Sequence, residues 1–211
     1  MARWEPNARE RLEQAAMELY RERGYDETAV ADIAARAGLT ERTFSRYFAD
    51  KREVLFGGSP ALRDFLTETI AGATGALGPI DVVTAALEAT SALFEERRPF
   101  ARARQAIIAT HPALQERELI KLASLALAIA GALRTRGVPE PAATLAAETG
   151  IAIFKLAFER WVNDSKKRDL GHHVREALAQ LRVVTAGEER RRPSRRRSDT
   201  SAAKRARRAS R

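Results

Sequence analysis

Residues 39–51, LTERTFSRYFADK, bring together side chains that donate hydrogen bonds to nucleic acids. Arg42 and Arg46 carry guanidinium groups, which bind guanine edges and phosphate oxygens in a bidentate manner. Tyr47 and Lys51 supply a phenol and an ammonium group, which donate to phosphate oxygens without reading a base. The chemistry that this stretch favours is therefore the non-covalent binding of a nucleic-acid backbone and its base edges.

The same stretch contains the aromatic side chains of Phe44 and Phe48, which are four residues apart. On a helix with about 100° per residue these two rings share one face, while Arg42 and Arg46 lie on the other side. We expect the aromatic face to hold the helix to its domain and the arginines to point outward. A single exposed arginine is most often merely solvated, so the assignment depends on the pattern around it.

No catalytic or metal-binding motif appears elsewhere in the sequence. The chain lacks cysteine, which excludes disulfides and thiol catalysis and agrees with a cytoplasmic location. It also lacks G-x-S-x-G, a glycine-rich phosphate loop and H-E-x-x-H, so we expect no enzyme activity, no catalytic residue and no cofactor. The adjacent His172 and His173 have no further spaced ligands, which favours surface or interface histidines over a metal site.

Apolar residues recur at three- and four-residue spacing along most of the chain, which predicts an all-α fold. Thr28, Thr40 and Asp50 are the predicted N-caps, and Gly24 and Gly38 are expected to end helices. Helices are expected over residues 7–23, 28–37, 40–48, from 51 onward, 60–74, 80–97, 99–110, 112–136, 140–164 and 170–184. No apolar run is long enough to predict a membrane span.

Composition divides the chain into a small domain of three helices (1–56), a larger helical bundle (57–186) and a basic tail (187–211). The tail holds eleven Lys/Arg and three Asp/Glu, a net of +8 out of the chain's +9. We expect it to be disordered, because it shows no apolar periodicity. The rest of the chain is therefore nearly neutral. Two functions are possible for the basic tail: a solubilising extension, or an additional sequence-independent contact with DNA.

The helices expected over 28–37 and 40–48 frame the turn AGLT, residues 37–40. Two helices joined by a short turn with glycine form a helix-turn-helix, whose second helix enters the major groove of DNA. Residues 36–52 carry five basic and two acidic groups, although residues 1–56 have a net charge of −1. The positive charge available for DNA is therefore local, and we expect the affinity for DNA to depend on salt.

Residues 28–56, TAVADIAARAGLTERTFSRYFADKREVLF, resemble the DNA-binding signature of the TetR family of bacterial repressors. The resemblance covers about residues 10–56 and includes the turn glycine, a Thr-Phe pair, a Tyr-Phe pair and a lysine three residues later. It implies contacts with the DNA backbone by Thr28, Thr43, Tyr47 and Lys51. The complete predicted DNA-binding set is Thr28, Thr40, Glu41, Arg42, Thr43, Ser45, Arg46, Tyr47 and Lys51.

The resemblance places positions 41, 42 and 45 on the base-reading side of the recognition helix. Arg42 is the best candidate for a bidentate contact with guanine. Glu41 either accepts a hydrogen bond from cytosine or stabilises the N-terminus of its helix. Ser45 is short where many relatives carry an aromatic residue, and Arg46 reaches either a base or a phosphate.

The resemblance also implies that residues 57–186 serve for dimerisation and ligand sensing. Helix 142–163 is apolar over more than one face, which favours a four-helix bundle with a partner copy over a purely intrachain core. The predicted dimer residues are Ile153, Phe154, Phe158, Trp161, Val174, Leu178 and Leu181. The predicted pocket residues are Phe65, Leu66, Ile70, Leu87, Thr90, Phe94, Arg104, Ile108, Leu122 and Leu125.

The motif ERTF-x-RYF followed by K-x-x-V-L-F resembles the corresponding residues of an actinobacterial branch of the family, whose members are thought to sense acyl-CoA-like ligands. The implied function is a homodimeric repressor on a near-palindromic operator in double-stranded DNA, released by a small apolar or acyl-CoA-like effector. Two alternatives remain: an activator on the same fold, and a helical ligand-binding protein or enzyme with a vestigial helix-turn-helix. No membrane partner is expected.

Overall fold

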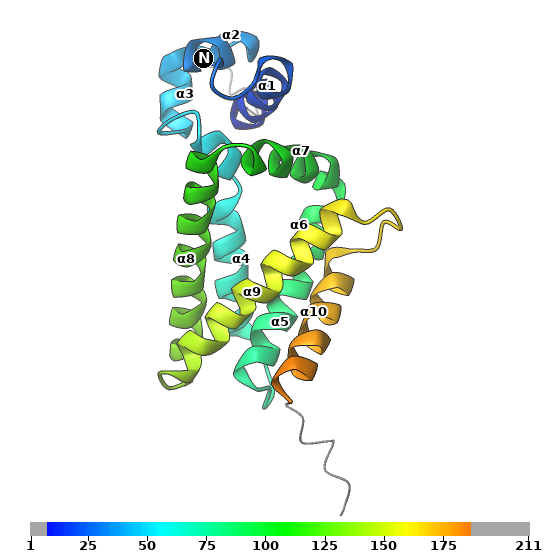
Figure 1. The fold of residues 1–211 in the computed structure, drawn as a ribbon. Helices are drawn as coiled ribbons and strands as arrows, with labels where there is room; N and C mark the ends of the chain where they lie inside the picture. Colours follow the sequence, from blue (N-terminus) through cyan, green and yellow to red (C-terminus); the bar gives the residue numbers. More distant parts are fainter. Residues whose placement is uncertain (1–7, 187–211) are drawn as a thin grey trace, which may run out of the picture. The chain divides into compact units, whose positions relative to one another are not determined.

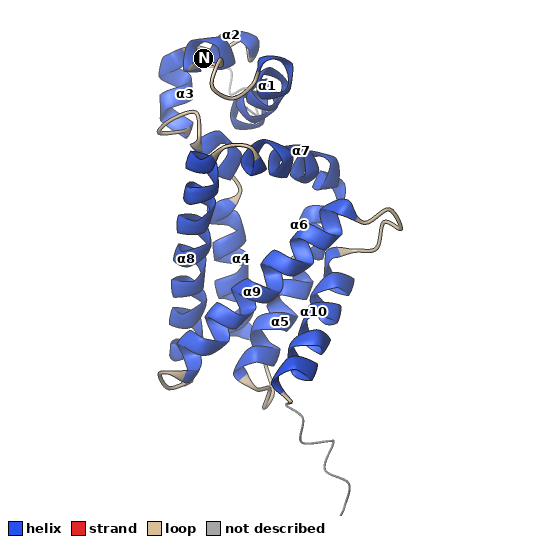
Figure 2. Cartoon of the chain, viewed as in Figure 1, coloured by secondary structure: helices blue, strands red, loops and turns tan. Residues whose placement is uncertain are grey.

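The structure, a computed structural model, describes residues 8–186, and all secondary structure in that range is helical (Figures 1 and 2). The all-α prediction is therefore confirmed. The helices are α1 (Ala8–Arg23), α2 (Val30–Arg36), α3 (Glu41–Tyr47), the short 3-10 helix η1 (Glu53–Phe56), α4 (Ser59–Gly72), α5 (Pro79–Ala89), α6 (Ser91–Phe94), the 3-10 helix η2 (Glu95–Arg97), α7 (Arg98–Ala109), α8 (Pro112–Thr135), α9 (Ala142–Asn163) and α10 (Leu170–Thr185). The predictions for the tail, 187–211, lie outside the described residues.

The first three helices pack around an apolar cluster in which Leu12, Leu19 and Ile33 have no exposed surface. Helix α2 ends at the turn because Gly38 adopts a positive φ of 65°, which a residue with a Cβ atom rarely adopts. Arg11 of α1 donates a hydrogen bond to the carbonyl oxygen of Ala37 and so ties this turn to the first helix. The helix-turn-helix is thereby fixed on α1.

The same apolar cluster continues into α7 and α8. Ile107, Ile108 and Leu114 are buried in it, at 8%, 1% and 0% exposure, beside side chains of α1 and α3. No break in packing therefore marks the predicted boundary between residues 56 and 57. Residues up to Leu178 form one compact unit, and a second unit begins at Ala179.

In the larger part of this unit, α8 packs against both α4 and α9, and α5 packs against α9 (Figure 1). Gly150 allows α5 and α9 to approach closely: a Cβ atom on it would lie 2.4 Å from Cγ1 of the fully buried Val83. Within residues 8–186, no helix is both long and apolar enough to cross a membrane.

Two predicted helix boundaries are confirmed by their capping contacts. The Thr40 hydroxyl accepts a hydrogen bond from the Thr43 backbone nitrogen at 3.1 Å, as expected for an N-cap. The Asp50 carboxylate accepts from the backbone nitrogens of Arg52 and Glu53 at 2.8 and 3.1 Å. The chain after Asp50, however, forms only the short 3-10 helix η1 rather than a full helix from residue 51.

Two other predictions were wrong. Thr28 does not cap α2; the N-cap is Ala29, whose backbone nitrogen donates to the Asp32 carboxylate at 3.1 Å. The single helix expected over 80–97 is divided into α5, α6 and η2, with the first break at Thr90. Thr90 is fully buried and donates its hydroxyl to the Leu87 carbonyl oxygen at 2.6 Å, a local bond that competes with continuation of the helix.

Candidate nucleic-acid interface

Helix α3 separates its aromatic and its polar side chains as the sequence predicted. Phe44 and Phe48 are 1% and 3% exposed, and their ring centroids lie 5.5 Å apart inside the N-terminal core. The exposed side of the helix carries Arg42, Ser45 and Arg46. The packed aromatic face therefore holds the outward-facing row in a fixed orientation.

Two arginines of the exposed row differ in what they contact. Arg42 makes no hydrogen bond or ion pair with any other described residue, so its guanidinium is free for an external acceptor. The Arg46 guanidinium lies 4.9 Å from the centroid of the Tyr47 ring and donates to the Tyr47 hydroxyl at 3.2 Å. Arg46 and Tyr47 thus form one stacked pair with donors to offer at the end of α3.

The remaining predicted residues of α3 lie near its N-terminus. Thr40 and Glu41 are exposed, and Thr43 is half-buried. The hydroxyl oxygens of Thr40 and Thr43 are 3.0 Å apart, so each already has a neighbour in the cap. Glu41 lies in the first turn of α3, where the helix dipole stabilises a carboxylate.

The side chains of Thr28 and Lys51 donate hydrogen bonds to backbone carbonyl oxygens of their own chain. Thr28 is 1% exposed and donates its hydroxyl to the Gly24 carbonyl oxygen at 2.8 Å. The Lys51 ammonium donates to the carbonyl oxygens of Tyr25, Asp26 and Thr28 at 2.9, 3.1 and 2.9 Å. A phosphate contact by either side chain stays a prediction that requires these bonds to be exchanged.

The sequence did not predict how the helix-turn-helix is joined to the later helices. Glu53 of η1 accepts from Arg117 Nε at 2.6 Å and from Lys121 Nζ at 2.9 Å, both on α8. Arg104 of α7 donates to the Leu55 carbonyl oxygen at 2.5 Å. These contacts join residues about fifty to seventy positions apart, so local sequence patterns cannot predict them.

The predicted pocket residues lie in the helical core or at its edge, and a role in ligand binding stays a prediction for them. Six are buried in packed core: Leu66, Ile70, Leu87, Thr90, Ile108 and Leu125. Phe65, Phe94, Leu122 and Arg104 are half-buried, and the Arg104 guanidinium also lies 3.1 Å from Glu118. An open hollow of about 560 Å³ exists between α1 and α7, beside Glu13, Arg97 and Phe100, but none of the predicted pocket residues lines it.

The predicted dimer residues are largely core within one chain. Trp161 and Val174 have no exposed surface, and Ile153 and Phe154 are 4% and 7% exposed. Phe158, Leu178 and Leu181 are half-buried. The exposed apolar row of α9 consists instead of Leu145, Ala152 and Leu156, which repeat at helical spacing on another face.

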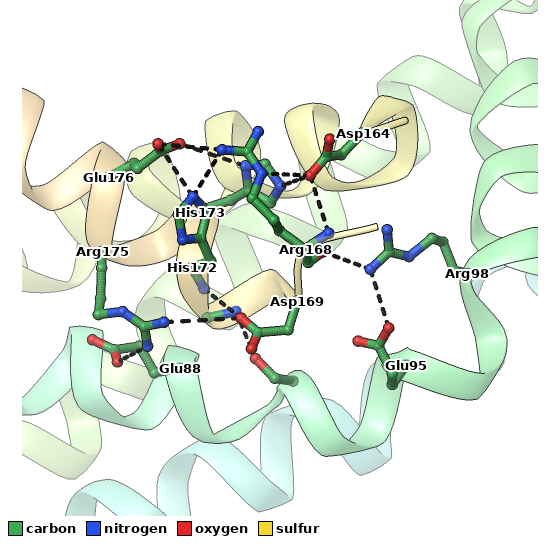
Figure 3. A network of polar contacts seen from close by, with 12 residues as sticks. Glu88, Glu95, Arg98, Asp164, Arg168, Asp169, His172, His173, Arg175 and Glu176 are labelled. Carbon is green, nitrogen blue, oxygen red and sulfur yellow. Dashed lines mark hydrogen bonds and ion pairs between the residues drawn. The ribbon is translucent and has the colours of Figure 1, made fainter. Parts of the chain in front are cut away.

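The two adjacent histidines belong to a polar network at the turn between α9 and α10 (Figure 3). His173 is only 2% exposed, so the expectation of a surface or interface histidine was wrong for it. Its Nε2 lies 3.1 Å from the Asp164 carboxylate, which Arg168 also contacts at 2.8 Å. Within residues 8–186, no cluster of three or more His, Cys, Asp or Glu side chains is arranged to hold a metal ion.

Two family profiles together match most of the chain. The profile described as bacterial regulatory proteins of the tetR family matches residues 13–56, and the profile of the MftR C-terminal domain matches residues 77–186. The second match alone spans more than half of the chain. The chain belongs to the TetR family. It is a DNA-binding, ligand-responsive transcriptional regulator and not an enzyme, as the sequence predicted.

Relatives agree with this membership. The chain is 30% identical over 194 residues to MftR of Mycobacterium tuberculosis, which carries the name of a mycofactocin biosynthesis transcriptional regulator; the match covers 85% of this chain and 90% of the relative.

Solved structures of two transcriptional regulators share the fold. FadR of Bacillus subtilis in complex with stearoyl-CoA has a TM-score of 0.55 at 19% identity, covering 82% of this chain and 96% of that chain. SmeT, the repressor of the Stenotrophomonas maltophilia multidrug efflux pump SmeDEF, has a TM-score of 0.54 at 19% identity, covering 85% and 90%.

Proposed function

We propose that this TetR-family regulator is a homodimeric repressor that reads its operator with the exposed row of α3 and is released by a small amphiphilic effector. The observation that carries the proposal is the division of α3: Phe44 is locked in the core, while Arg42 extends freely to solvent. A guanidinium on a rigid helix is suited to a bidentate contact with guanine in the major groove.

A two-fold dimer supports reading of a near-palindromic operator, because it presents two copies of α3 to successive half-sites. We assign the dimer surface to the exposed apolar row of α9, which consists of Leu145, Ala152 and Leu156. Leu145 and Leu156 are 63% and 36% exposed, so the row offers an apolar surface that a partner copy could cover.

Two observations support an effector with an apolar part, an acyl-CoA-like molecule being one candidate. The related FadR of Bacillus subtilis was solved with stearoyl-CoA, and the MftR-type domain covers residues 77–186 of this chain. Effector and operator would favour different conformations of the dimer, so that binding of one weakens binding of the other.

Fluorescence anisotropy with duplexes from the region upstream of the chain's own gene tests the proposal. We expect saturable binding to one near-palindromic duplex and binding at least tenfold weaker to a scrambled duplex of equal length. Arg42→Ala should remove most of this preference, at a cost of about 1–3 kcal/mol for the lost base contact. Arg63→Ala, an exposed arginine of α4 paired with Asp64, is the matched control and should bind as the unaltered chain does.

Equal affinity for the operator and the scrambled duplex, or no effect of Arg42→Ala, would contradict the proposal. A promoter fusion then separates repression from activation: expression should rise when the regulator is deleted.

A further inference from the structure

Three buried side-chain atoms have no hydrogen-bond partner among residues 8–186, and all three lie around the turn between α9 and α10. They are Nη1 of Arg98, Nε1 of Trp161 and Nδ1 of His173. Trp161 is 0% exposed and His173 is 2% exposed. Native proteins leave few buried polar atoms unpaired, and each one calls for an explanation such as a bound ligand.

Arg98 and Trp161 form one unit. The Arg98 guanidinium carbon lies 4.9 Å from the centroid of the Trp161 ring, a cation–π stack between the start of α7 and the end of α9. Figure 3 shows how Arg98 is held: Nη2 donates to the Arg168 carbonyl oxygen at 2.6 Å and to Glu95 at 3.1 Å, while the other terminal nitrogen carries no contact. The stack therefore holds two unpaired donors, one charged and one neutral, and both atoms are buried.

The unpaired atom of His173 has a different environment. Its Nδ1 lies 3.7 Å from a Glu176 carboxylate oxygen, and its Nε2 faces Asp164 at 3.1 Å. An anion placed there would meet two carboxylates. Of the three unpaired atoms, only those of Arg98 and Trp161 are suited to a negatively charged acceptor.

The surroundings of the stack are aromatic. Phe94 of α6 lies 5.8 Å from Trp161 between ring centroids, and Phe158 lies 5.4 Å from Trp161 and 5.6 Å from Phe154. Phe94 and Phe158 are half-buried, so this aromatic cluster reaches the surface. A molecule with one acidic group and an apolar body would satisfy the donors and cover the rings at the same time.

We propose that Arg98 and Trp161 anchor the acidic head group of the effector, whose apolar body packs on Phe94, Phe154 and Phe158. An oxygen of a carboxylate or a phosphate would accept from Arg98 Nη1 and from the Trp161 indole N–H once the side chains that cover these two buried atoms move aside. The inference rests on the proposed function, since it names the site and the chemical class of the effector.

The position of Arg98 explains how such a ligand acts on DNA binding. Arg98 is the first residue of α7, and the preceding residue, Arg97, lies 3.2 Å from Glu13 of α1. Further along α7, Arg104 holds the Leu55 carbonyl oxygen of η1. A ligand that draws the start of α7 toward α9 therefore acts on the same helix that packs against the helix-turn-helix.

Tryptophan fluorescence tests the site, because the chain has two tryptophans and Trp4→Phe leaves Trp161 as the only one. The probes are octanoate and, as a neutral molecule of equal length, 1-octanol. We expect octanoate to change the emission saturably and to bind at least tenfold more tightly than 1-octanol. Arg98→Gln should weaken octanoate at least tenfold, Arg98→Lys should weaken it less, and Arg63→Gln should leave its affinity unchanged.

Trp161→Phe keeps the ring stack but removes the indole donor, and calorimetry should show octanoate binding weakened several-fold. If circular dichroism shows that Arg98→Gln does not fold, Trp161→Phe and Arg98→Lys test whether the two side chains bind the acidic head group. Octanoyl-coenzyme A is titrated in parallel: the tighter of the two Arg98-dependent ligands identifies the head group as a carboxylate or a phosphate.

The anchor is overturned if neither acid binds, or if both bind Arg98→Lys and Trp161→Phe as tightly as the unaltered protein. That result would leave the donors to ordered water. Operator binding, measured separately, keeps the two hypotheses apart. A protein that binds octanoate through Arg98 but binds no operator contradicts the proposed function and not the site.

Discussion

Lys51 directs its three N–H donors at the carbonyl oxygens of Tyr25, Asp26 and Thr28, the loop that precedes α2. Its ammonium also lies 4.5 Å from the centroid of the Tyr25 ring. An ammonium group has no further donor to give, so in the unliganded chain this lysine positions the helix-turn-helix rather than offering charge to phosphate. The family resemblance alone would have assigned it to the DNA backbone.

Lys51→Met should therefore lower the free energy of unfolding by about 2 kcal/mol, because it removes charge-assisted hydrogen bonds to three carbonyl groups. Urea unfolding followed by circular dichroism measures the change. Arg52→Met, which removes only an exposed ion pair with Asp50, should change stability by less than about 0.5 kcal/mol. Unchanged stability of Lys51→Met with a smaller salt dependence of DNA binding would instead assign Lys51 to phosphate.

Arg46 and Arg42 should be distinguishable by their effect on salt dependence. Because Arg46 is stacked on Tyr47 and bonded to its hydroxyl, we predict that it follows Tyr47 to the DNA backbone. Arg46→Gln should weaken binding to all sequences alike and reduce the slope of log affinity against log salt by about 1. A change in sequence preference at one operator position, with the slope unaltered, would show that Arg46 reads a base.

At the scale of helices, the contact between α5 and α9 depends on a missing side chain. Gly150→Ala would place a methyl group 2.4 Å from Cγ1 of Val83, a stiff β-branched residue with no exposed surface. We expect a loss of about 1–3 kcal/mol in unfolding free energy from overpacking. Gly131→Ala in α8 is the control, because the nearest atom to its new methyl group is the end of Arg134 at 3.7 Å.

Gly131→Ala should be neutral or stabilising by up to about 1 kcal/mol, as alanine favours a helix over glycine. Both values come from thermal or urea melts of the same preparation. Equal stability of the two alanine variants would mean that α5 and α9 are not in close contact.

The ion pairs of Glu53 should make the joint between η1 and α8 sensitive to acid. Burial opposes ionisation of Glu53, but hydrogen bonds from Arg117 and Lys121 outweigh it and lower its pKa below the ordinary 4.5. A lowered pKa means that the carboxylate contributes stability above the ordinary value and loses it as pH falls through the folded value.

Glu53→Gln should therefore be less stable than the unaltered chain at pH 7, and the difference should shrink as pH falls below about 4.5. Urea midpoints measured from pH 7 to pH 3 give both curves. Parallel curves over this range would show that Glu53 does not titrate differently in the folded and unfolded chain.

At this scale, features that depend on residues close together in the sequence could be predicted, and features that depend on distant residues could not. The cap at Thr40 and the two faces of α3 depend on residues a few positions apart, so periodicity and capping rules predicted them. The break at Thr90 depends on one buried hydroxyl, and a threonine inside an apolar pattern does not reveal whether it will be buried. The joint between Glu53 and α8 depends on contacts more than sixty residues apart, which no local pattern contains.

At the scale of the whole molecule, the structure changes which residues of α9 are candidates for the dimer. Trp161 and Phe154 were predicted from apolarity, but apolarity cannot distinguish an intrachain core from an interface. Exposure can: Leu145 and Leu156 are 63% and 36% exposed on the other face. The candidate DNA residues come from a signature with fixed spacing rather than from apolarity, and their contacts with DNA stay a prediction.

Leu156→Glu should convert the proposed dimer into a monomer of 23.3 kDa in light scattering coupled to size-exclusion chromatography. A charge at the centre of an apolar interface is costly to bury, whereas it is harmless in water. Leu127→Glu is the matched control, because Leu127 is 72% exposed and belongs to α8 rather than to α9, and this variant should stay dimeric. Retention of the dimer by Leu156→Glu and its loss in Leu127→Glu would move the interface to α8.

The core that Ile107, Ile108 and Leu114 share with α1 and α3 bears on how such regulators can be recombined. A chimera cut after residue 56 would leave part of that core uncovered and place unmatched side chains of a foreign α7 against it. A chimera that combines this DNA-binding region with the sensor domain of another regulator therefore has to include residues 98–114 of this chain together with residues 8–56. The smallest exchangeable part of this regulator is two stretches of chain, and only the first of them contains the helix-turn-helix.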